Sequence, residues 1–104
     1  MKYRVKVEKD VVKYLKKLGT SQYSYFKRRF KKLQDDKRGY RLLSKSGRIE
    51  LWELRSLSHR VYYTVENGFI VIDNIEYEGN ISVLTCSNKN QQQRTIDKLK
   101  RNIK

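Results

Sequence analysis

Apolar and charged residues alternate at the start of the chain and then change to a helical period. Residues 2–7, KYRVKV, alternate at every position, which is typical of a half-buried strand. Val11, Leu15 and Leu18 then recur at helical spacing, and Gly19 follows at a position where helices commonly end. The pattern therefore predicts one strand followed by one amphipathic helix.

A second helix is predicted over residues 21–36, with Thr20 and Ser21 as candidate N-caps. Its large apolar residues fall on one stripe, and its lysines and arginines fall outside that stripe. Such a stripe is typical of a helix face that packs on a sheet, and it does not indicate a cofactor site. The stripe is formed by Tyr23, Phe26, Phe30 and Leu33.

The next segment, residues 35–48, loses the helical period and contains Gly39 and Gly47, so a basic connecting loop is predicted. A meander of strands is predicted after it, because runs of apolar and aromatic residues alternate with turn residues, of which Asn-Gly is the strongest hairpin signal. The predicted strands lie near residues 49–56, 59–66, 69–77 and 81–87, with turns at Leu57-Ser58, at Asn67-Gly68 and near Gly79-Asn80.

Residues 90–104 place Ile96, Leu99 and Ile103 on one face among lysines and arginines, which predicts a short basic C-terminal helix. A chain of 104 residues fits a single domain, 1–104, and cannot supply a second core. The expected fold class is α+β, with two N-terminal helices packed on an antiparallel sheet and a short helix at the C-terminal end.

The predicted turn at Leu57-Ser58 fixes the register of its two flanking strands, because a two-residue turn pairs Arg55 with Arg60. One face then points toward the helices and carries Trp52, Leu54, Val61, Tyr63 and Val65. The opposite face carries Glu53, Arg55, Arg60, Tyr62 and Thr64. Continuing the count through Asn67-Gly68 sets Ile70 beside Val65 and Ile72 beside Tyr63, while the register of the last hairpin stays open.

The charge balance indicates a polyanionic partner. Twenty-five lysines and arginines against 11 acidic residues give a net charge of +14, whereas a magnitude of ~2–8 normally suffices for solubility. Nucleic acid, the ribosome or an acidic protein is the expected class of partner. No apolar run approaches the roughly 20 residues that span a bilayer, and the first residues lack the apolar centre of a signal peptide, so a cytoplasmic protein without membrane contact is expected.

Cys86 and His59 are the only cysteine and histidine of the chain. A disulfide within the chain and a zinc tetrad are therefore excluded, and no metal or organic cofactor is implied. Cys86 is expected to behave as a small apolar side chain.

Two arginines directly opposite one another repel, and such a pair costs roughly 0.2–1 kcal/mol. A phosphodiester between Arg55 and Arg60 would relieve this repulsion through charge-assisted hydrogen bonds. Glu53 and Tyr62 lie one residue pair away, so the face could offer a base, cations and an acid for RNA cleavage. The alternative is an exposed surface network in which Glu53 simply neutralises both arginines. The pattern alone leaves both interpretations open.

The order of these elements, together with ELR at 53–55, HRVYYTV at 59–65, SNKNQQ at 87–92 and a basic final helix, resembles the RelE/ParE toxin superfamily of bacterial toxin–antitoxin systems, and within it the RelE/HigB-like branch. The resemblance implies two helices packed on an antiparallel sheet. It also implies a ribosome-dependent endoribonuclease that cuts mRNA, with its catalytic surface on a basic sheet face.

The resemblance assigns roles to individual residues. Arg60 matches an arginine that stabilises the phosphate, Arg55 matches another commonly basic position, and Lys89 lies where the family places a basic residue before the last helix. Glu53, as the base, and Tyr62 complete the expected catalytic set. Phosphates of mRNA and 16S rRNA are expected to contact Lys27, Arg28, Lys31, Lys32, Arg48, His59 and Arg94.

One departure leaves the activity open. Many active relatives carry a tyrosine or histidine near the final helix for proton transfer, but nothing after Tyr77 is aromatic here and the single histidine is His59. Either Tyr62 or His59 substitutes, or the nuclease activity is weak or lost. The alternative function is then a catalytically silent binding protein or a ParE-like gyrase poison. In each case a cognate antitoxin is the expected partner, and the free protein is expected to be a monomer.

Overall fold

A five-stranded sheet and three α-helices make up the described part of this computed structural model, which comprises residues 1–103. The side chain of Ile103 lies outside the described residues, and so does its predicted place on an apolar helix face. The elements are β1 (Lys2–Val7), α1 (Lys9–Lys17), α2 (Thr20–Leu33), β2 (Arg41–Ser46), β3 (Ile49–Ser56), β4 (His59–Ile72), β5 (Ile75–Asn88), the 3-10 turn η1 (Lys89–Gln91) and α3 (Gln92–Ile103).

The sheet has the strand order β1-β5-β4-β3-β2. Strands β2 to β5 pair antiparallel with their neighbours, and β1 pairs parallel with β5. The predicted α+β class is confirmed, but the sheet is mixed and not wholly antiparallel. β1 lies beside the last strand, β5, and not beside β2, so no hairpin joins it to its neighbour in the sheet.

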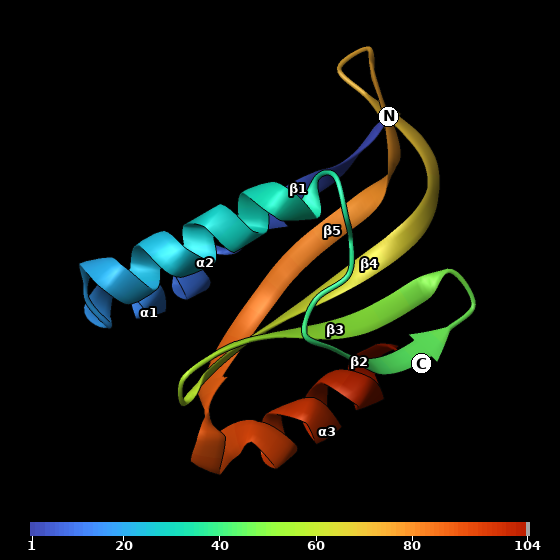
Figure 1. The fold of residues 1–104 in the computed structure, drawn as a ribbon. Helices are drawn as coiled ribbons and strands as arrows, with labels where there is room; N and C mark the ends of the chain where they lie inside the picture. Colours follow the sequence, from blue (N-terminus) through green and yellow to red (C-terminus); the bar gives the residue numbers. More distant parts are fainter. Residues whose placement is uncertain (104) are drawn as a thin grey trace.

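Helices cover both faces of the sheet. Figure 1 shows α1 and α2 side by side on one side of the sheet and α3 apart from them. Beneath α1 and α2 lies the larger core, formed by Val11, Leu15, Phe26, Phe30, Leu33, Leu54, Val61, Tyr63, Val65, Ile81 and Val83. Beneath α3 lies a smaller cluster of Leu51, Tyr62 and Ile96, flanked by Leu43 and Leu99.

The register predicted for β3 and β4 is confirmed from Arg55 opposite Arg60 to Leu51 opposite Thr64. Leu57 adopts a φ of 55°, so the turn at Leu57-Ser58 is made by a residue in the left-handed region. The face assignment is also confirmed, because the core under α1 and α2 contains Leu54 and not Tyr62. What the alternation did not reveal is that α3 covers part of the opposite face.

The segment predicted as a loop, residues 35–48, contains the edge strand β2. Ser46 pairs with Ile49, and Gly47 opens the intervening turn with a φ of 60°. The strand was missed because its burial is low and does not alternate clearly, with a register shift between Leu42 and Ser44.

The predicted hairpin turn at Asn67-Gly68 is wrong, and with it the pairing of Ile70 with Val65. Strand β4 continues through Gly68, with a bulge against β5, and the chain turns at Asp73-Asn74. Both turn residues have positive φ, 51° and 64°, as a two-residue hairpin turn requires. The turn predicted near Gly79-Asn80 is also wrong, because both residues lie within β5, opposite Asn67 and Glu66 of β4. The turn at Asp73-Asn74 was not predicted.

The side chain of Asn67 explains why that residue is not at a turn. Its Oδ1 accepts hydrogen bonds from Tyr3 Oη at 2.8 Å and Lys37 Nζ at 3.0 Å, and its Nδ2 donates to Glu50 Oε2 at 3.0 Å. Its backbone N–H and its Nδ2 also donate to the Arg48 carbonyl. Asn67, which lies on β4, thus connects that strand to β1, to β3 and to the segment that precedes β2.

Thr20 and Ser21 do not act as N-caps. Helix α2 begins at Thr20 directly after Gly19, which has a φ of 104°, and no side chain caps this end. Gly19 ends one helix and starts the next, so the connection leaves no position for a separate capping residue.

The segment between α2 and β2 crosses the sheet at Gly39. A Cβ at this position would lie 2.5 Å from Tyr63 Oη and 2.8 Å from the Glu53 carbonyl oxygen, which is closer than real Cβ contacts allow. Tyr63 Oη donates to the Lys37 carbonyl at 2.8 Å, and Tyr40 N–H donates to the Glu53 carbonyl at 2.7 Å. These bonds hold Tyr40 and the start of β2 against β3.

The substitution Gly39→Ala is expected to lower the free energy of unfolding by about 1–3 kcal/mol, the usual cost of overpacking. Denaturant titration measures this change. Lys45→Ala, at an exposed position of β2, is the control and is expected to stay within about 0.5 kcal/mol of the wild type. Equal stability of the two variants would contradict the close packing at Gly39.

The buried carboxyl of Glu50 makes stability depend on pH. Burial alone would raise its pKa, but hydrogen bonds from Lys37, Trp52 and Asn67 and the charge of Lys37 outweigh burial and lower the pKa below 4.5. Its stabilising contribution is therefore fully present above about pH 4.5 and is lost as the pH falls through the lower folded-state value.

Unfolding free energies measured across this acidic range should fall more steeply for the wild type than for Glu50→Gln. The glutamine cannot titrate, so this source of pH dependence disappears. Parallel curves for the two proteins would show that the carboxylate of Glu50 is not held in its charged form by these contacts.

Candidate nucleic-acid interface

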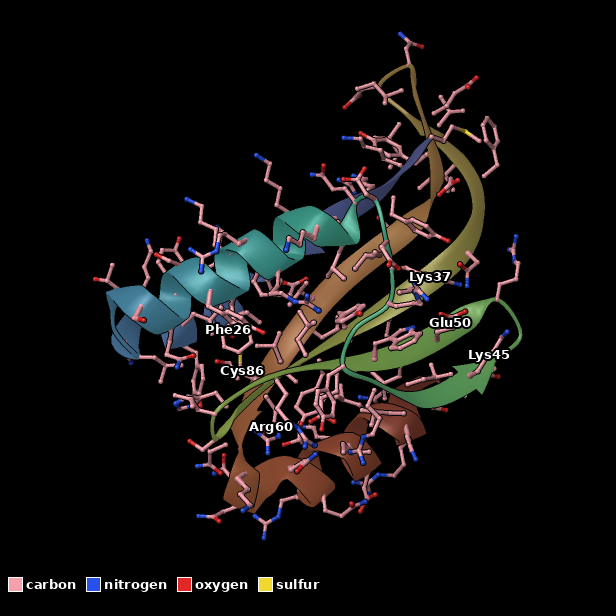
Figure 2. The ribbon with its side chains drawn as sticks, viewed as in Figure 1. Phe26, Lys37, Lys45, Glu50, Arg60 and Cys86 are labelled. Carbon is pink, nitrogen blue, oxygen red and sulfur yellow. The ribbon has the colours of Figure 1, made fainter. Side chains whose placement is uncertain are left out.

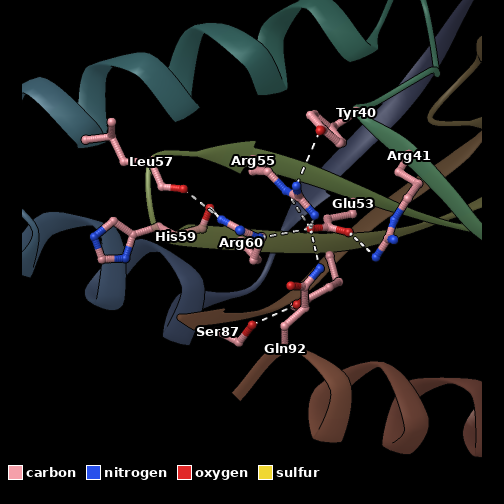
Figure 3. Close-up of polar contacts among 10 residues, drawn as sticks. Tyr40, Arg41, Glu53, Arg55, Leu57, His59, Arg60, Ser87 and Gln92 are labelled. Carbon is pink, nitrogen blue, oxygen red and sulfur yellow. Dashed lines mark hydrogen bonds and ion pairs between the residues drawn. The ribbon is translucent and has the colours of Figure 1, made fainter. Parts of the chain in front are cut away.

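The carboxylate of Glu53 is the centre of the arginine cluster on the α3 face of the sheet. Glu53 is fully buried. Oε1 accepts hydrogen bonds from Arg55 Nη2 at 3.1 Å and Nε at 3.2 Å, and from Gln92 Nε2 at 3.0 Å. Oε2 accepts from Arg41 Nη2 at 3.1 Å. Figure 3 shows these side chains converging from β2, β3, β4 and the start of α3.

Arg60 is the buried cation of the cluster. Its Nε lies 3.2 Å from Glu53 Oε1 as an ion pair but is not aligned for a hydrogen bond. Its Nη1 donates to the Leu57 carbonyl at 2.8 Å and to the His59 carbonyl at 3.3 Å. Only 6% of its side chain is exposed. Arg60 therefore stabilises the β3–β4 turn through hydrogen bonds to its carbonyl groups (Figures 2 and 3). Little of its side chain is left for a ligand to contact.

Arg41 and Arg55 are the accessible cations beside Glu53. Their side chains are 49% and 26% exposed, respectively. Arg55 also packs on Tyr40, with Cζ at 4.3 Å from the ring centroid and Nη1 donating to Tyr40 Oη at 3.3 Å. An incoming anion would therefore meet Arg41 and Arg55 before it could reach Arg60.

The hydroxyl of Tyr62 is buried beneath α3. Tyr62 Oη and Ser87 Oγ share a hydrogen bond of 2.7 Å. Burial raises the pKa of Tyr62, and the neighbouring carboxylate of Glu53 raises it further, against the opposing effects of Ser87 and the arginines. The raised pKa keeps the Tyr62 hydroxyl protonated at neutral pH and makes it a weaker acid than an exposed tyrosine.

Lys89 is exposed on η1, at the same end of the sheet as the cluster. It directly follows Ser87 and Asn88, which pair with Arg60 and His59. Lys89 therefore adds an exposed positive charge at this end of the sheet, outside the hydrogen bonds that hold Glu53.

His59 lies on the other face of the sheet. It alternates with Arg60 along β4, and its Nδ1 lies 3.2 Å from Tyr14 Oη of α1. The two rings meet edge to face with centroids 6.1 Å apart. His59, predicted to bind RNA, and Arg60, predicted to be catalytic, are thus adjacent in the chain but lie on opposite faces of the sheet.

The other predicted RNA-binding residues are distributed over several surfaces. Arg48 is exposed in the β2–β3 turn, where its guanidinium lies over Gly68, and Arg94 is exposed on α3 beside a hollow that Thr85 and Leu99 also line. The remaining ones are exposed on α2, on the helix layer opposite α3, and are Lys27, Arg28, Lys31 and Lys32.

Comparisons with known proteins give one informative match. No family model matches the chain, and no curated protein matches it significantly. A chain of the crystal structure of the archaeal RelE–RelB complex from Pyrococcus horikoshii OT3 matches with a TM-score of 0.64 and 26% identity, over 88% of this chain and 99% of that one. The chain has the fold of the RelE-like toxin superfamily. The resemblance inferred from its motifs is thereby confirmed.

The positive charge of this RelE-like chain is unevenly distributed. No lysine or arginine occurs between Arg60 and Lys89, a stretch that forms most of β4 and β5 and contains four acidic residues. The arginine cluster lies at the basic end of these strands, and their far ends form a ribbon whose tip carries acidic and exposed apolar side chains. A polyanion would therefore be attracted to the cluster and repelled by the tip.

Cys86 offers no reactive thiol. Burial raises its pKa to about 12, so the thiolate is scarce at neutral pH. Among the described residues of the RelE-like chain, no cluster of three or more histidine, cysteine or acidic side chains could hold a metal ion. In the same part of the chain, no helix has the length and apolar character to cross a membrane.

Sequence reasoning missed three members of the arginine cluster, namely Tyr40, Arg41 and Gln92. Tyr40 and Arg41 lie where a loop was predicted, and the pairing of Arg41 with Glu53 follows only once β2 is recognised. The available signal was the Tyr-Arg pair directly before an apolar dipeptide and a Gly-containing turn. Gln92 reaches Glu53 through the packing of α3, for which the local sequence contains no signal.

Glu53→Gln is expected to destabilise the protein by about 3–5 kcal/mol, because it leaves the buried guanidinium of Arg60 without a counter-charge. Arg41→Gln removes a half-exposed partner of the same carboxylate and is expected to cost at most about 1 kcal/mol. Chemical denaturation of both variants checks the difference. Similar losses would mean that the burial of Arg60 does not set the energetic role of Glu53.

Proposed function

We propose that this protein is the toxin of a toxin–antitoxin pair and that it cleaves mRNA on the ribosome as a metal-independent endoribonuclease. The observation that carries the proposal is the cluster of three arginines around Glu53 on a basic face of a RelE-like fold. A polyanion such as RNA is the ligand that this charge distribution favours. Action on the ribosome would place the protein in the cytoplasm.

The proposed reaction transfers a phosphoryl group within the RNA, from the 5′-oxygen of one nucleotide to the 2′-oxygen of the preceding one. The 2′-oxygen attacks the adjacent phosphorus and the bond from phosphorus to the 5′-oxygen breaks. The 2′-hydroxyl proton passes to water, and the leaving 5′-oxygen takes a proton from water. Arg55 and Arg41 are placed to bind the phosphate and to stabilise the negative charge that develops on it. Arg60 offsets the negative charge of Glu53 through their ion pair and so reduces the repulsion between Glu53 and the phosphate.

Glu53 is better suited to hold the arginines than to accept a proton. Both of its oxygens accept hydrogen bonds, and it has no exposed surface. We propose that the earlier expectation of Glu53 as general base be replaced by a positioning role. Catalysis would then rest mainly on orientation of the RNA and on charge stabilisation.

An antitoxin is the proposed protein partner. The similar archaeal chain comes from a complex of RelE with RelB. A segment with acidic and apolar residues would complement the net charge of +14 and cover the cluster.

The burial of Arg60 and Tyr62 favours a second candidate function. A RelE-fold protein whose cations and tyrosine are tied within the fold could act through protein contacts alone, as a silent binding protein or as a gyrase poison of the ParE type. Cleavage of mRNA distinguishes this candidate from the first.

A translation assay with defined mRNA, with and without ribosomes, tests the proposal by mapping new 5′ ends. Arg55→Gln is expected to lower the cleavage rate about 10²–10³-fold, the usual effect of losing one transition-state hydrogen-bond donor. It is a sharper test than Arg60→Ala, because Arg60 is buried and its removal would disturb the turn as well as the reaction.

Lys6→Gln is the matched control, since it also removes one exposed charge but lies on β1 at the opposite edge of the sheet. It is expected to cleave like the wild type. Intact mRNA with the wild type would favour the protein-binding candidate, and equal loss in both variants would point to net charge and not to Arg55.

A further inference from the structure

Tyr40 is an aromatic side chain that is held in solvent by a fixed backbone. It is 59% exposed, although its N–H donates to the Glu53 carbonyl at 2.7 Å. The preceding Gly39 packs so closely on Tyr63 and Glu53 that no Cβ fits there. The backbone that carries the ring is therefore held in place by close packing and by a hydrogen bond to β3.

Arg55 fixes the ring as well as the backbone. The guanidinium Cζ lies 4.3 Å from the ring centroid, and Nη1 donates to the ring hydroxyl at 3.3 Å. Figure 3 shows the Tyr40 side chain joined to Arg55 at the margin of the cluster. Because Arg55 covers one face and the residue is still 59% exposed, the opposite face of the ring is open to solvent.

An open aromatic face beside exposed guanidinium groups is the combination that binds single-stranded nucleic acid. Bases stack on the ring, and cations contact the phosphates on either side. Arg41 is the next residue, and its half-exposed guanidinium lies with that of Arg55 on the same carboxylate. The two arginines are therefore placed to contact the backbone of a nucleotide whose base lies on Tyr40.

We propose that Tyr40 is a stacking platform for one nucleobase of a single-stranded RNA, with Arg41 and Arg55 on its phosphates. This deepens the proposed function, on which it rests for the identity of the ligand. Stacking accepts any base, so the platform would position the RNA without reading its sequence. The alternative is that Tyr40 only shields Arg55 and makes no contact with RNA.

The test compares two labelled short oligonucleotides with the same number of phosphates. One is an all-uridine strand with 2′-O-methyl riboses, which cannot be cleaved by attack of the 2′-oxygen, and the other is the same backbone without bases. Fluorescence anisotropy with the purified full chain at low salt gives both affinities. The wild type is expected to prefer the strand with bases roughly 5- to 100-fold, as stacking on one aromatic ring predicts.

Two substitutions separate the ring from its hydroxyl. Tyr40→Phe keeps the ring and is expected to retain the preference, whereas Tyr40→Leu keeps apolar bulk and is expected to lose most of it. The salt dependence of binding should be the same for both, because it counts phosphate contacts and not bases. Arg41→Gln should reduce that salt dependence, by about 0.7 in the logarithmic slope, and should keep the preference for bases.

An unchanged preference in Tyr40→Leu would overturn the proposal, as would equal binding of both strands, or no binding of either, by the wild type. Failure of the proposed function has a different signature. If the wild type shows the Tyr40-dependent preference but does not cut mRNA in the translation assay, the stacking site stands and the nuclease does not. If it cuts mRNA and Tyr40→Leu binds like the wild type, the nuclease stands and the stacking site does not.

Discussion

The fully buried carboxylate of Glu53 is the interaction on which the rest of this structure depends. Removing one carboxylate and one guanidinium from water costs several kcal/mol for each ion, and only close pairing and hydrogen bonds repay that cost. Glu53 meets this requirement with groups from β2, β3, β4 and the start of α3. The single negative charge of Glu53 therefore lies against both facing arginines of β3 and β4 and offsets part of their positive charge. The repulsion that a bare Arg55–Arg60 pair would cause is relieved by Glu53 before any phosphate arrives.

A second polar cluster determines where the cationic residues lie. Lys37 donates hydrogen bonds to Glu50 and Asn67 on the face of the sheet opposite Glu53. Two residues later, Gly39 packs closely against Tyr63. Together these contacts fix the direction in which the chain enters β2, and so the positions of Tyr40 and Arg41. The site is thus assembled by contacts between residues far apart in the sequence. Its accessible members, Arg41 and Arg55, lie toward the margin of the sheet, and the carboxylate of Glu53 that pairs with them is buried.

The sequence predicted those features that short-range periodicity controls. The helical stripe from Phe26 to Leu33, the strand before it and the register of the β3–β4 hairpin all follow from spacing within a few residues, and all are confirmed. The errors have one physical origin. The turn at Asn67-Gly68 was lost to long-range hydrogen bonds, and β2 is an edge strand that only its partner defines.

For the site, the sequence indicated Glu53, Arg55 and Arg60 as neighbours on one face but could not show which of them is buried. Burial depends on α3, which packs on that face through Ile96 and places Gln92 against Glu53. The two readings that the sequence left open, a phosphate site and a neutralised network, are therefore not exclusive. All three arginines contact Glu53, but the inner one is buried and the outer two keep exposed surface. A cation that is already hydrogen-bonded to a carboxylate loses less freedom on binding an anion than a mobile lysine does, because its geometry is set in advance. The same pairing weakens its attraction for phosphate, so the position of Glu53 sets a balance between preorganisation and strength of binding.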